Sequence, residues 1–457
     1  MRQFVRRIHF VGIGGVGMSG IAEVLRNLGY EVSGSDLKST EITRRLQAAG
    51  VRVYEGHAAA HARGAQVLVV SSAVSPRNPE VAEARRRGVP VVQRAQMLAE
   101  LARMKKAVTV AGSHGKTTTT SMVALALRAA GADPTMIIGG QLKNIGGGAR
   151  LGLGDYLVAE ADESDGSFLH LSPLVAVVTN VDDDHLDHYG TMAALKDAFA
   201  AHLARLPFYG AAVLCADDPA LMSVRARVAR PVVTYGFSAG ADWRATGLRL
   251  TKDGSSCEVL RGGRRLLTLR LRVPGRHNAL NALGALAAGA FLGFDPKRLA
   301  RGLEAFRGVG RRLDRLGEAG GVEFVDDYGH HPTEIRAALA AVRLRRARRV
   351  IVVFQPHRYT RTKLLARAFG PALRGADLAF ATEIYPAGEK PIRGVGPALI
   401  VDAARRAGVR CAPFPGALEL AKQLRSGDVV LTLGAGDVWK IGEDLLRRRR
   451  ARSAATV

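Results

Sequence analysis

A short apolar run that leads directly into a glycine loop constrains this chain more than any other feature. Residues 108–111 read V-T-V-A, which is typical of a buried strand, and G-S-H-G-K-T follows before a helical pattern begins. Backbone N–H groups and the helix dipole bind phosphate in such a strand–loop–helix unit. We therefore expect a nucleotide to contact Gly112, Ser113, His114, Gly115, Lys116, Thr117 and Thr118.

The chemistry of this loop assigns roles to two of its residues. Lys116 is expected to reach the β- and γ-phosphates, and the Thr117 hydroxyl to hold Mg²⁺. The common pattern has a glycine five positions before the G-K-T glycine, where this chain has Val110. The loop is therefore a tighter G-x-x-G-K-T, and an ordinary strand–turn–helix is the alternative interpretation.

Length and composition favour a globular protein of about three domains. The chain has 457 residues, 47% of them hydrophobic and 23% charged, enough for about 150 residues per domain. No apolar run approaches the roughly 18–20 residues of a membrane span. The basic N-terminus resembles the start of a signal peptide, but the short, glycine-rich run after it is better explained as a strand and turn. We predict a cytoplasmic protein with no integral membrane segment.

The charge and the cysteines exclude several classes of function. The formal net charge is +25, yet aromatic residues make up only 5% of the chain and do not interleave with the basic ones. We therefore predict polyanionic small substrates and no nucleic-acid partner, with residues 447–450 in a frayed, solvated tail. Cys215, Cys257 and Cys411 are too far apart for a zinc cluster and odd in number for a disulfide framework, so we expect them in the core.

A second glycine motif lies near the N-terminus. A strand expected at residues 8–11 precedes Gly12, Gly14 and Gly17, which fit G-x-G-x-x-G, and a helix is expected at 21–28. Asp36 ends the next strand, 19 residues after Gly17, where an acid that binds ribose hydroxyls would stand. The motif fits a dinucleotide cofactor, but any nucleoside diphosphate satisfies the same physics. Residues 67–70 form another expected strand, followed by Ser71, Ser72 and Ala73 at a ligand-binding edge.

Acidic residues follow two further expected strands. Residues 156–159 run into E-A-D-E-S-D, which starts at Glu160, and residues 175–178 run into N-V-D-D-D-H-L-D-H. Two acidic strand ends in one domain with a phosphate loop indicate a metal-dependent phosphoryl transfer, with His185 as a candidate ligand. We expect Asp183 and Asp184 to be helix N-caps or solvated turn residues.

Polar residues at later helix starts and strand ends complete the pattern. Asn278 and Asn281 lie at i, i+3 spacing after His277, and spacing alone favours helix capping over contact with a base. Strands expected at 323–325, 350–354, 379–382 and 429–433 each precede a polar cluster, as in a doubly wound sheet. Arg358 and Arg361 are spaced to clamp a carboxylate or phosphate.

Seven motifs in order resemble the muramyl ligases. They are I-H-F-V-G-I-G-G-V-G-M-S-G-I-A, A-G-S-H-G-K-T-T-T, E-A-D-E-S-D-G-S-F, H-L-D-H-Y-G, G-R-H-N-A-L-N-A, D-D-Y-G-H-H-P-T-E and Q-P-H-R-Y-T-R-T. The resemblance covers essentially the whole chain except the Arg-rich tail. The resemblance implies three α/β domains: a Rossmann-like domain for UDP-N-acetylmuramate at residues 1–106, an ATP-binding P-loop domain at 107–312, and a Rossmann-like amino-acid domain at 313–457 with a basic tail from about 447.

The resemblance also implies roles for individual residues. It places Mg²⁺, as two ions, on Thr117, Glu160 and His185, and it adds His277, Asn278, Asn281, Arg312 and Asp327 to the ATP site. The implied UDP-sugar contacts are Gly14, Gly15, Val16, Gly17, Met18, Ser19, Asp36, Ser71, Ser72, Ala73, His330 and Arg358. The amino acid is expected at Tyr328, Arg358 and Arg361, and the catalytic residues are expected to be Lys116, His185, Arg358 and Arg361. Several relatives carry a carbamoylated lysine, but Lys196 does not fit its spacing, and we do not assign that modification.

The implied reaction joins an amino acid to a sugar carboxylate. ATP phosphorylates the lactoyl carboxylate of UDP-N-acetylmuramate, and the amine of L-alanine attacks the acyl phosphate, with the protein a monomer or homodimer. A recycling ligase that attaches a tripeptide to the same UDP-sugar is the alternative within the family. A nucleotide-switched or nucleic-acid-binding ATPase and a dehydrogenase are alternatives from other classes, and pyridine-nucleotide binding would discriminate the dehydrogenase.

Overall fold

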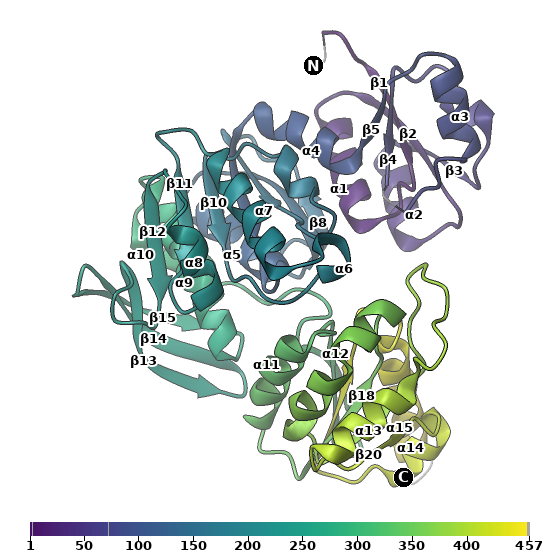
Figure 1. Cartoon of the computed structure of the whole chain (residues 1–457), viewed down its shortest axis with the longest axis vertical. Coiled ribbons are helices and arrows are strands. Elements are labelled where there is room, and N and C mark those ends of the chain that lie inside the picture. The colour runs from purple at the N-terminus through teal and green to yellow at the C-terminus, as the bar shows by residue number, and fades with distance from the viewer. Residues whose placement is uncertain (2, 72, 455–457) are drawn as a thin grey trace. The chain divides into compact units, whose positions relative to one another are not determined.

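The chain folds into α/β layers built on three separate β-sheets (Figure 1). A computed structural model describes residues 1, 3–71 and 73–454. The chain divides into two compact units. The first comprises Met1–Thr246, Glu258–Leu269 and Leu280–Arg307, and the second comprises Gly247–Cys257, Arg270–Ala279 and Gly308–Val457. The predicted boundaries at 106/107 and 312/313 stay a prediction.

The N-terminal sheet is parallel, with strand order β3-β2-β1-β4-β5. Its strands are β1 (Arg7–Val11), β2 (Glu31–Asp36), β3 (Arg52–Glu55), β4 (Val67–Val70) and β5 (Val91–Gln93). Its helices are α1 (Val16–Asn27), α2 (Glu41–Ala48), α3 (Pro79–Arg86) and α4 (Arg94–Arg103), with a 3₁₀ turn, η1 (Ala59–Ala62).

Helix α1 begins at Val16, so the predicted start at residue 21 is wrong. Glycines at positions 17 and 20 weaken the sequence signal for a helix. Packing explains why glycine stands at both positions. A Cβ on Gly17 would lie 3.2 Å from Arg94 Cδ, and a Cβ on Gly20 would lie 3.1 Å from Ala149 Cβ. The tertiary contacts therefore favour small residues inside this helix.

The central sheet has ten strands in the order β15-β14-β13-β12-β11-β10-β6-β9-β7-β8. The strands are β6 (Lys106–Ala111), β7 (Thr135–Leu142), β8 (Gly147–Arg150), β9 (Tyr156–Glu160), β10 (Val175–Val178), β11 (Ala211–Cys215), β12 (Val232–Gly236), β13 (Trp243–Thr251), β14 (Gly254–Arg261) and β15 (Arg264–Leu271). The helices are α5 (Lys116–Ala129), α6 (Leu186–Tyr189), α7 (Met192–Ala204), α8 (Pro219–Arg225), α9 (Arg276–Phe291) and α10 (Pro296–Glu304), with a 3₁₀ turn, η2 (Ser167–His170). Strands β10, β6 and β9 are parallel neighbours, so their carboxyl ends meet at one edge of the sheet.

The C-terminal sheet has the order β16-β17-β21-β18-β19-β20, and only the β16–β17 pair is antiparallel. The strands are β16 (Asp314–Ala319), β17 (Val322–Asp327), β18 (Arg349–Phe354), β19 (Leu378–Ala381), β20 (Cys411–Pro413) and β21 (Asp428–Leu433). The helices are α11 (Pro332–Arg343), α12 (Tyr359–Ala372), α13 (Pro397–Arg406), α14 (Ala417–Gln423) and α15 (Trp439–Ala454), with a 3₁₀ turn, η3 (Leu373–Gly375). Alternate strand residues enter two separate apolar cores, as Val325 and Phe324 do on β17, so both faces of the sheet are covered.

The arginines at 447–450 lie in α15, so the predicted frayed tail is wrong. Leu445 and Leu446 are buried in the core beneath this helix, and Arg447 and Arg448 both pair with Asp444 one turn earlier. Apolar packing and i, i+3 and i, i+4 ion pairs stabilise the helix through this segment.

The described residues also include all three cysteines and the helices that could be compared with a membrane span. All three cysteines are free and buried, as expected of core residues. In the part of the chain that the structure describes, no helix combines the length and the apolarity that crossing a membrane requires.

Candidate functional site

The phosphate loop connects β6 to α5 at the edge where the carboxyl ends of β9 and β10 also meet. Gly112 has φ +129°, and a Cβ there would lie 2.1 Å from Thr179 Oγ1. Gly115 has φ +81°, and a Cβ there would lie 2.9 Å from Asn281 Oδ1. The two glycines are needed because neighbouring groups approach the loop too closely for side chains.

The segment after β10 fixes the shape of this loop. Asn180 Oδ1 accepts from the His114 backbone N–H at 2.9 Å, and Thr179 Oγ1 donates to the His114 carbonyl at 2.6 Å. Asp182 Oδ2 lies 2.9 Å from His114 Nε2, and its backbone N–H donates to Ser113 Oγ at 2.9 Å. Residues 179–182 therefore brace the loop through both its backbone and its side chains.

Lys116 is held at the first position of α5 by oxygen atoms. Its Nζ donates to the Gly112 carbonyl at 2.8 Å and to Glu163 Oε1 at 2.6 Å. Burial alone would lower the pKa of Lys116, but the negative charges of Glu163, Asp162 and Glu160 outweigh it and raise the pKa above its ordinary value. Lys116 is therefore a fixed cation at the phosphate loop.

Glu163 is a fully buried carboxylate that the sequence analysis did not select. Burial raises its pKa to about 7 even though Lys116 favours the ionised form. Among the described residues, its Oε2 atom has no hydrogen-bond partner. Its sequence signal was its place in the acidic run after β9, three residues beyond Glu160.

The three predicted magnesium ligands lie in the segments that follow three adjacent strands or end them: Thr117 in the first turn of α5, Glu160 at the end of β9, and His185 at the start of α6. Thr117 Oγ1 donates to Glu160 Oε2 at 2.9 Å, and His185 Nε2 lies 3.7 Å from Glu163 Oε1. Oxygen atoms are the ligands that Mg²⁺ prefers, and the orphaned Glu163 Oε2 adds one to the hydroxyl and the Glu160 carboxylate. The donor set fits magnesium.

Asp184 is buried, so the expectation that it is a solvated turn residue is wrong. Its Oδ1 accepts from the His185 backbone N–H at 2.9 Å, and its Oδ2 lies 3.6 Å from His185 Nε2. It orients the histidine, which takes the left-handed conformation at φ +59°. Asp183 is exposed, as expected.

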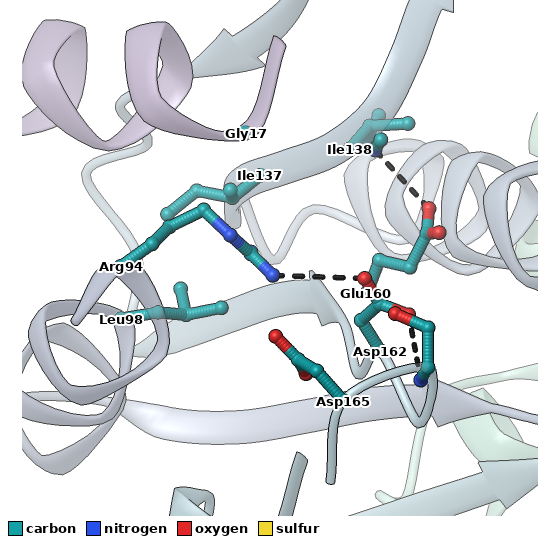
Figure 2. A pocket seen from close by; sticks show the side chains of 10 residues that line it. Gly17, Arg94, Leu98, Ile137, Ile138, Glu160, Asp162 and Asp165 are labelled. Carbon is teal, nitrogen blue, oxygen red and sulfur yellow. Dashed lines mark hydrogen bonds and ion pairs between the residues drawn. The ribbon is translucent and has the colours of Figure 1, made fainter. Parts of the chain in front are cut away.

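A cavity of about 260 Å³ opens beside these acids (Figure 2). Figure 2 shows Arg94 extending across it toward acidic side chains, and Arg94 Nη2 lies 3.7 Å from Asp162 Oδ2. The lining residues come from α1, from α4, from β7 and from the end of β9 with the loop after it; they are Gly17, Arg94, Leu98, Ile137, Ile138, Gly139, Glu160, Asp162, Ser164 and Asp165. The cavity thus joins one residue of the N-terminal glycine motif, Gly17, to a predicted metal ligand, Glu160. No motif in the sequence indicated Arg94.

The N-terminal glycine loop is held by an acid at the end of β2. Gly14 N–H donates to Asp36 Oδ2 at 2.8 Å, and a Cβ on Gly14 would lie 2.9 Å from that oxygen. Gly15 caps α1, Val16 is exposed in its first turn, and Met18 and Ser19 are buried. Ser71 lies against Gly12, and Ala73 is exposed. Ser72 lies outside the described residues.

The three polar residues of the fifth motif all lie in the first turns of α9. Asn281 lies against Gly115 of the phosphate loop in the first unit. His277 and Asn278 belong to the second unit, where burial and then the charge of Arg312 lower the pKa of His277 to about 4. Asn278 Nδ2 donates to the Pro274 carbonyl at 2.6 Å from inside α9, so the predicted capping role is wrong for this side chain.

Asp327 lies at the end of β17 in the second unit and is buried. Its carboxylate accepts from the Leu313 N–H at 2.8 Å and the Gly329 N–H at 2.7 Å. Burial raises its pKa to about 6, although the charge of Arg312 opposes the shift. Arg312 itself lies over the Tyr328 ring at 5.0 Å and reaches Glu334.

A second group of predicted residues gathers at the start of α12. Arg361 is buried, and its Nη1 lies 3.2 Å from His357 Nδ1. Arg358 precedes the helix at φ +66°, and its backbone N–H donates to the Tyr385 carbonyl at 2.9 Å. Aromatic contacts then run from His357 to His330, at 5.5 Å, and on to Tyr328, at 5.5 Å. Two arginines at a helix N-terminus favour an anion such as a carboxylate.

Family models match most of the chain. They are the Mur ligase family, catalytic domain, over residues 7–106; the Mur ligase middle domain over 110–289; and the Mur ligase, glutamate ligase domain, over 311–436. These matches agree with three domains of α/β fold.

Named relatives cover nearly the whole chain. The UDP-N-acetylmuramate–L-alanine ligase of Geobacter sp. (strain M21) is 52% identical and covers 98% of both chains, and that of Endomicrobium trichonymphae is 48% identical over 96% of this chain and 98% of its own. Among solved structures, the UDP-N-acetylmuramate-alanine ligase of Thermotoga maritima aligns with a TM-score of 0.82 at 31% identity, over 98% of this chain and 99% of its own. A murein peptide ligase of Psychrobacter arcticus 273-4 aligns with a TM-score of 0.72 at 26% identity, over 97% and 98%.

Proposed function

The chain belongs to the Mur ligase family, and we propose that it joins L-alanine to the lactoyl carboxylate of UDP-N-acetylmuramate at the expense of ATP. The observation that carries this proposal is the cavity that joins Gly17 of the N-terminal glycine motif to Glu160 at the edge of the phosphate loop. A sugar carboxylate in that cavity would approach the γ-phosphate of an ATP bound to the loop. Relatives with L-alanine ligase names at about half identity support the same substrates.

The chemistry requires two anions to meet. A free carboxylate is a poor acyl donor because hydroxide is a poor leaving group, and phosphorylation by ATP converts it into an acyl phosphate. Lys116 and Arg94 each place a positive charge beside the acidic residues of this site. Both charges are fixed before substrate binds, so they stabilise the charge on the transferring phosphoryl group without reorganisation.

We assign the magnesium ligands to Thr117, Glu160 and His185, with the orphaned oxygen of Glu163 available as another. Two Mg²⁺ ions at these ligands would neutralise charge on the phosphates. The protein's own contribution is to hold the hydroxyl, carboxylates and imidazole at the sheet edge where three adjacent strands, β6, β9 and β10, lead into α5, the acidic loop and α6. His185 is oriented for this by Asp184.

We assign the amino acid to the start of α12. Arg361 and Arg358 would bind the carboxylate of L-alanine, and Tyr328 and His330 would border it. Arg361 is suited to this because it is buried and a planar guanidinium binds a carboxylate through two hydrogen bonds. His277, Asn278, Asn281, Arg312 and Asp327 are proposed to border ATP. Free buried cysteines are consistent with a reducing compartment, and we propose the cytoplasm.

Phosphate release tests the proposal. The protein is mixed with MgATP and UDP-N-acetylmuramate, and L-alanine is compared with the L-Ala-γ-D-Glu-diaminopimelate tripeptide. We expect release that requires L-alanine and a product one alanyl residue heavier by mass spectrometry. Release with the tripeptide alone would favour the alternative ligase that attaches a tripeptide to the same UDP-sugar; the Psychrobacter arcticus relative is a murein peptide ligase. No sugar-dependent release from a folded, ATP-binding sample would overturn the proposal.

A further inference from the structure

A fully buried glutamate at the start of α3 collects polar contacts from the surrounding elements. Glu80 Oε2 lies 2.8 Å from His9 Nε2 on β1 and accepts from Ser35 Oγ on β2 at 2.8 Å. Its Oε1 lies 3.1 Å from His57 Nδ1 and 3.5 Å from His61 Nδ1 on η1. His9 and Ser35 are also fully buried. One carboxylate thus connects β1, β2, α3 and the segment after β3.

The same contacts lead directly to the N-terminal glycine loop. The Ser35 carbonyl accepts from the Gly12 N–H at 2.9 Å and the Ile13 N–H at 3.0 Å. The next residue, Asp36, accepts from the Gly14 N–H at 2.8 Å. Ser35 is therefore attached to Glu80 by its side chain and to the loop by its backbone.

The loop and β2 are packed so closely that small shifts of either would matter. A Cβ on Gly34 would lie 2.5 Å from Ile13 Cδ1 and 2.7 Å from the Phe10 carbonyl, so Gly34 lets the loop pass over β2 without a gap. The end of β2 therefore sets the position of the loop, and Glu80 sets the position of the end of β2.

The Glu80 side chain favours its ionised form although it is buried. Burial would raise its pKa, but hydrogen bonds from His9, Ser35 and His57 outweigh burial and lower the pKa. Burying an ionised group costs desolvation energy even when the group has several partners, and well-packed apolar side chains avoid this cost. The stability of the core alone therefore does not require the Glu80 carboxylate.

From these contacts we propose that Glu80 is a positioning residue for the sugar nucleotide. It holds Ser35 and Asp36 under the glycine loop, where they accept from the Gly12, Ile13 and Gly14 N–H groups. The N–H groups of the first turn of α1, which follows the loop, are thereby directed at the diphosphate. The inference rests on the proposed function only in that this loop is taken to hold the UDP-sugar.

The test is Glu80→Gln in the full chain, which keeps the shape of the side chain and removes its charge. We expect the KM for UDP-N-acetylmuramate to rise about 10- to 100-fold, the range that misplaced groups cost in comparable sites, while kcat and the KM for ATP stay within about twofold. Glu83→Gln is the matched control, because Glu83 lies on the same helix and pairs at the surface with Arg86 and Arg87. It is expected to change none of these values.

Ser35→Ala keeps the proposal testable if Glu80→Gln does not fold. It removes one hydroxyl from the cluster and leaves the Ser35 backbone contacts with the loop, and we expect a smaller rise in the same KM. Calorimetric titration with uridine diphosphate alone measures the effect on binding without the ligation reaction, and we expect weaker binding by both variants.

Three results would overturn the inference. Unchanged KM and unchanged uridine diphosphate affinity in the folded variants would show that Glu80 does not position the loop. A fall in kcat with KM unchanged would show a purely structural role that reduces the active fraction. A wild-type protein that binds no uridine nucleotide would overturn both this inference and the proposed function. Either of the first two results, with a wild-type protein that ligates UDP-N-acetylmuramate, would overturn this inference alone.

Discussion

The Lys116 ammonium lies 2.6 Å from the Glu163 carboxylate, although the two residues are 47 positions apart in the sequence. The pair joins the first residue of α5 to the loop that follows β9. It fixes a positive charge where the phosphate loop would meet its nucleotide, and the first prediction tests that charge.

Lys116→Ala is expected to reduce alanine-dependent phosphate release by at least roughly 10²- to 10³-fold, because the charge on the transferring phosphoryl group loses a preorganised partner. Affinity for UDP-N-acetylmuramate, measured by calorimetry, should stay within about twofold. Lys106→Ala is the control, since Lys106 lies exposed at the start of β6, the strand that leads into the loop. Parallel loss of sugar binding in a folded Lys116→Ala protein would contradict this division of roles.

Gly115→Ala is expected to abolish measurable ATP binding, because the new Cβ would lie 2.9 Å from Asn281 Oδ1 and the residue would be strained at φ +81°. Gly64→Ala separates the two causes, because Gly64 has φ +83° with open space around it. It should cost about 1 kcal/mol of stability from backbone strain and leave activity intact. Because Asn281 is itself proposed to border ATP, Asn281→Ala is measured alone and together with Gly115→Ala in a fluorescent-nucleotide titration. An ATP affinity of the double variant close to that of Asn281→Ala alone would show that the clash is responsible, whereas a double variant as weak as Gly115→Ala would show that strain alone is responsible.

Arg361→Lys is expected to raise the KM for L-alanine about tenfold or more, because an ammonium cannot reproduce the two parallel hydrogen bonds of a guanidinium. The KM for ATP should not change. Arg367→Lys on the exposed face of the same helix, α12, is the control. Equal KM values for all three proteins in the phosphate-release assay would remove Arg361 from the amino-acid site.

His202 is predicted to destabilise the protein in acid. Burial lowers its pKa to about 4, against an ordinary value of 6.5, while its hydrogen bond to the Phe168 carbonyl opposes the shift. The unfolded chain therefore binds a proton that the folded chain excludes, and stability falls as the pH drops from 6.5 toward 4, by up to about 3 kcal/mol. His202→Gln should reduce the difference between urea midpoints at pH 7 and pH 4.5. The exposed His170→Gln is the control, and an unchanged difference for His202→Gln would refute the assignment.

The sequence predicted the strand cores and the phosphate loop well, because those signals are local. The strands at 67–70 and 175–178 match β4 and β10, whose four residues are all buried. The start of α1 and the helical end of the chain were missed, because the deciding contacts come from Arg94, from Ala149 and from the core beneath Leu446. No pattern within a single segment carries that information.

The candidate site shows the same limit. Glycine spacing was sufficient to select Lys116 and Thr117, and the family resemblance singled out Glu160 from the acidic run after β9. The structure brings these three residues together. Arg94 and Glu163 were missed because their importance depends on which segments become neighbours in space. Asn278 was interpreted as a cap from spacing, whereas its side chain bonds to the carbonyl four residues earlier.

The order β10-β6-β9 has a consequence for how such an enzyme can diversify. The groups proposed to handle phosphate lie at the ends of these three adjacent strands, whereas the arginines proposed to recognise the amino acid belong to a different sheet and a different compact unit. Mutations that change which amine is accepted can therefore accumulate without disturbing the machinery that consumes ATP. In such an arrangement a gene can duplicate, keep one half of its chemistry unaltered, and acquire a new acceptor through the other half.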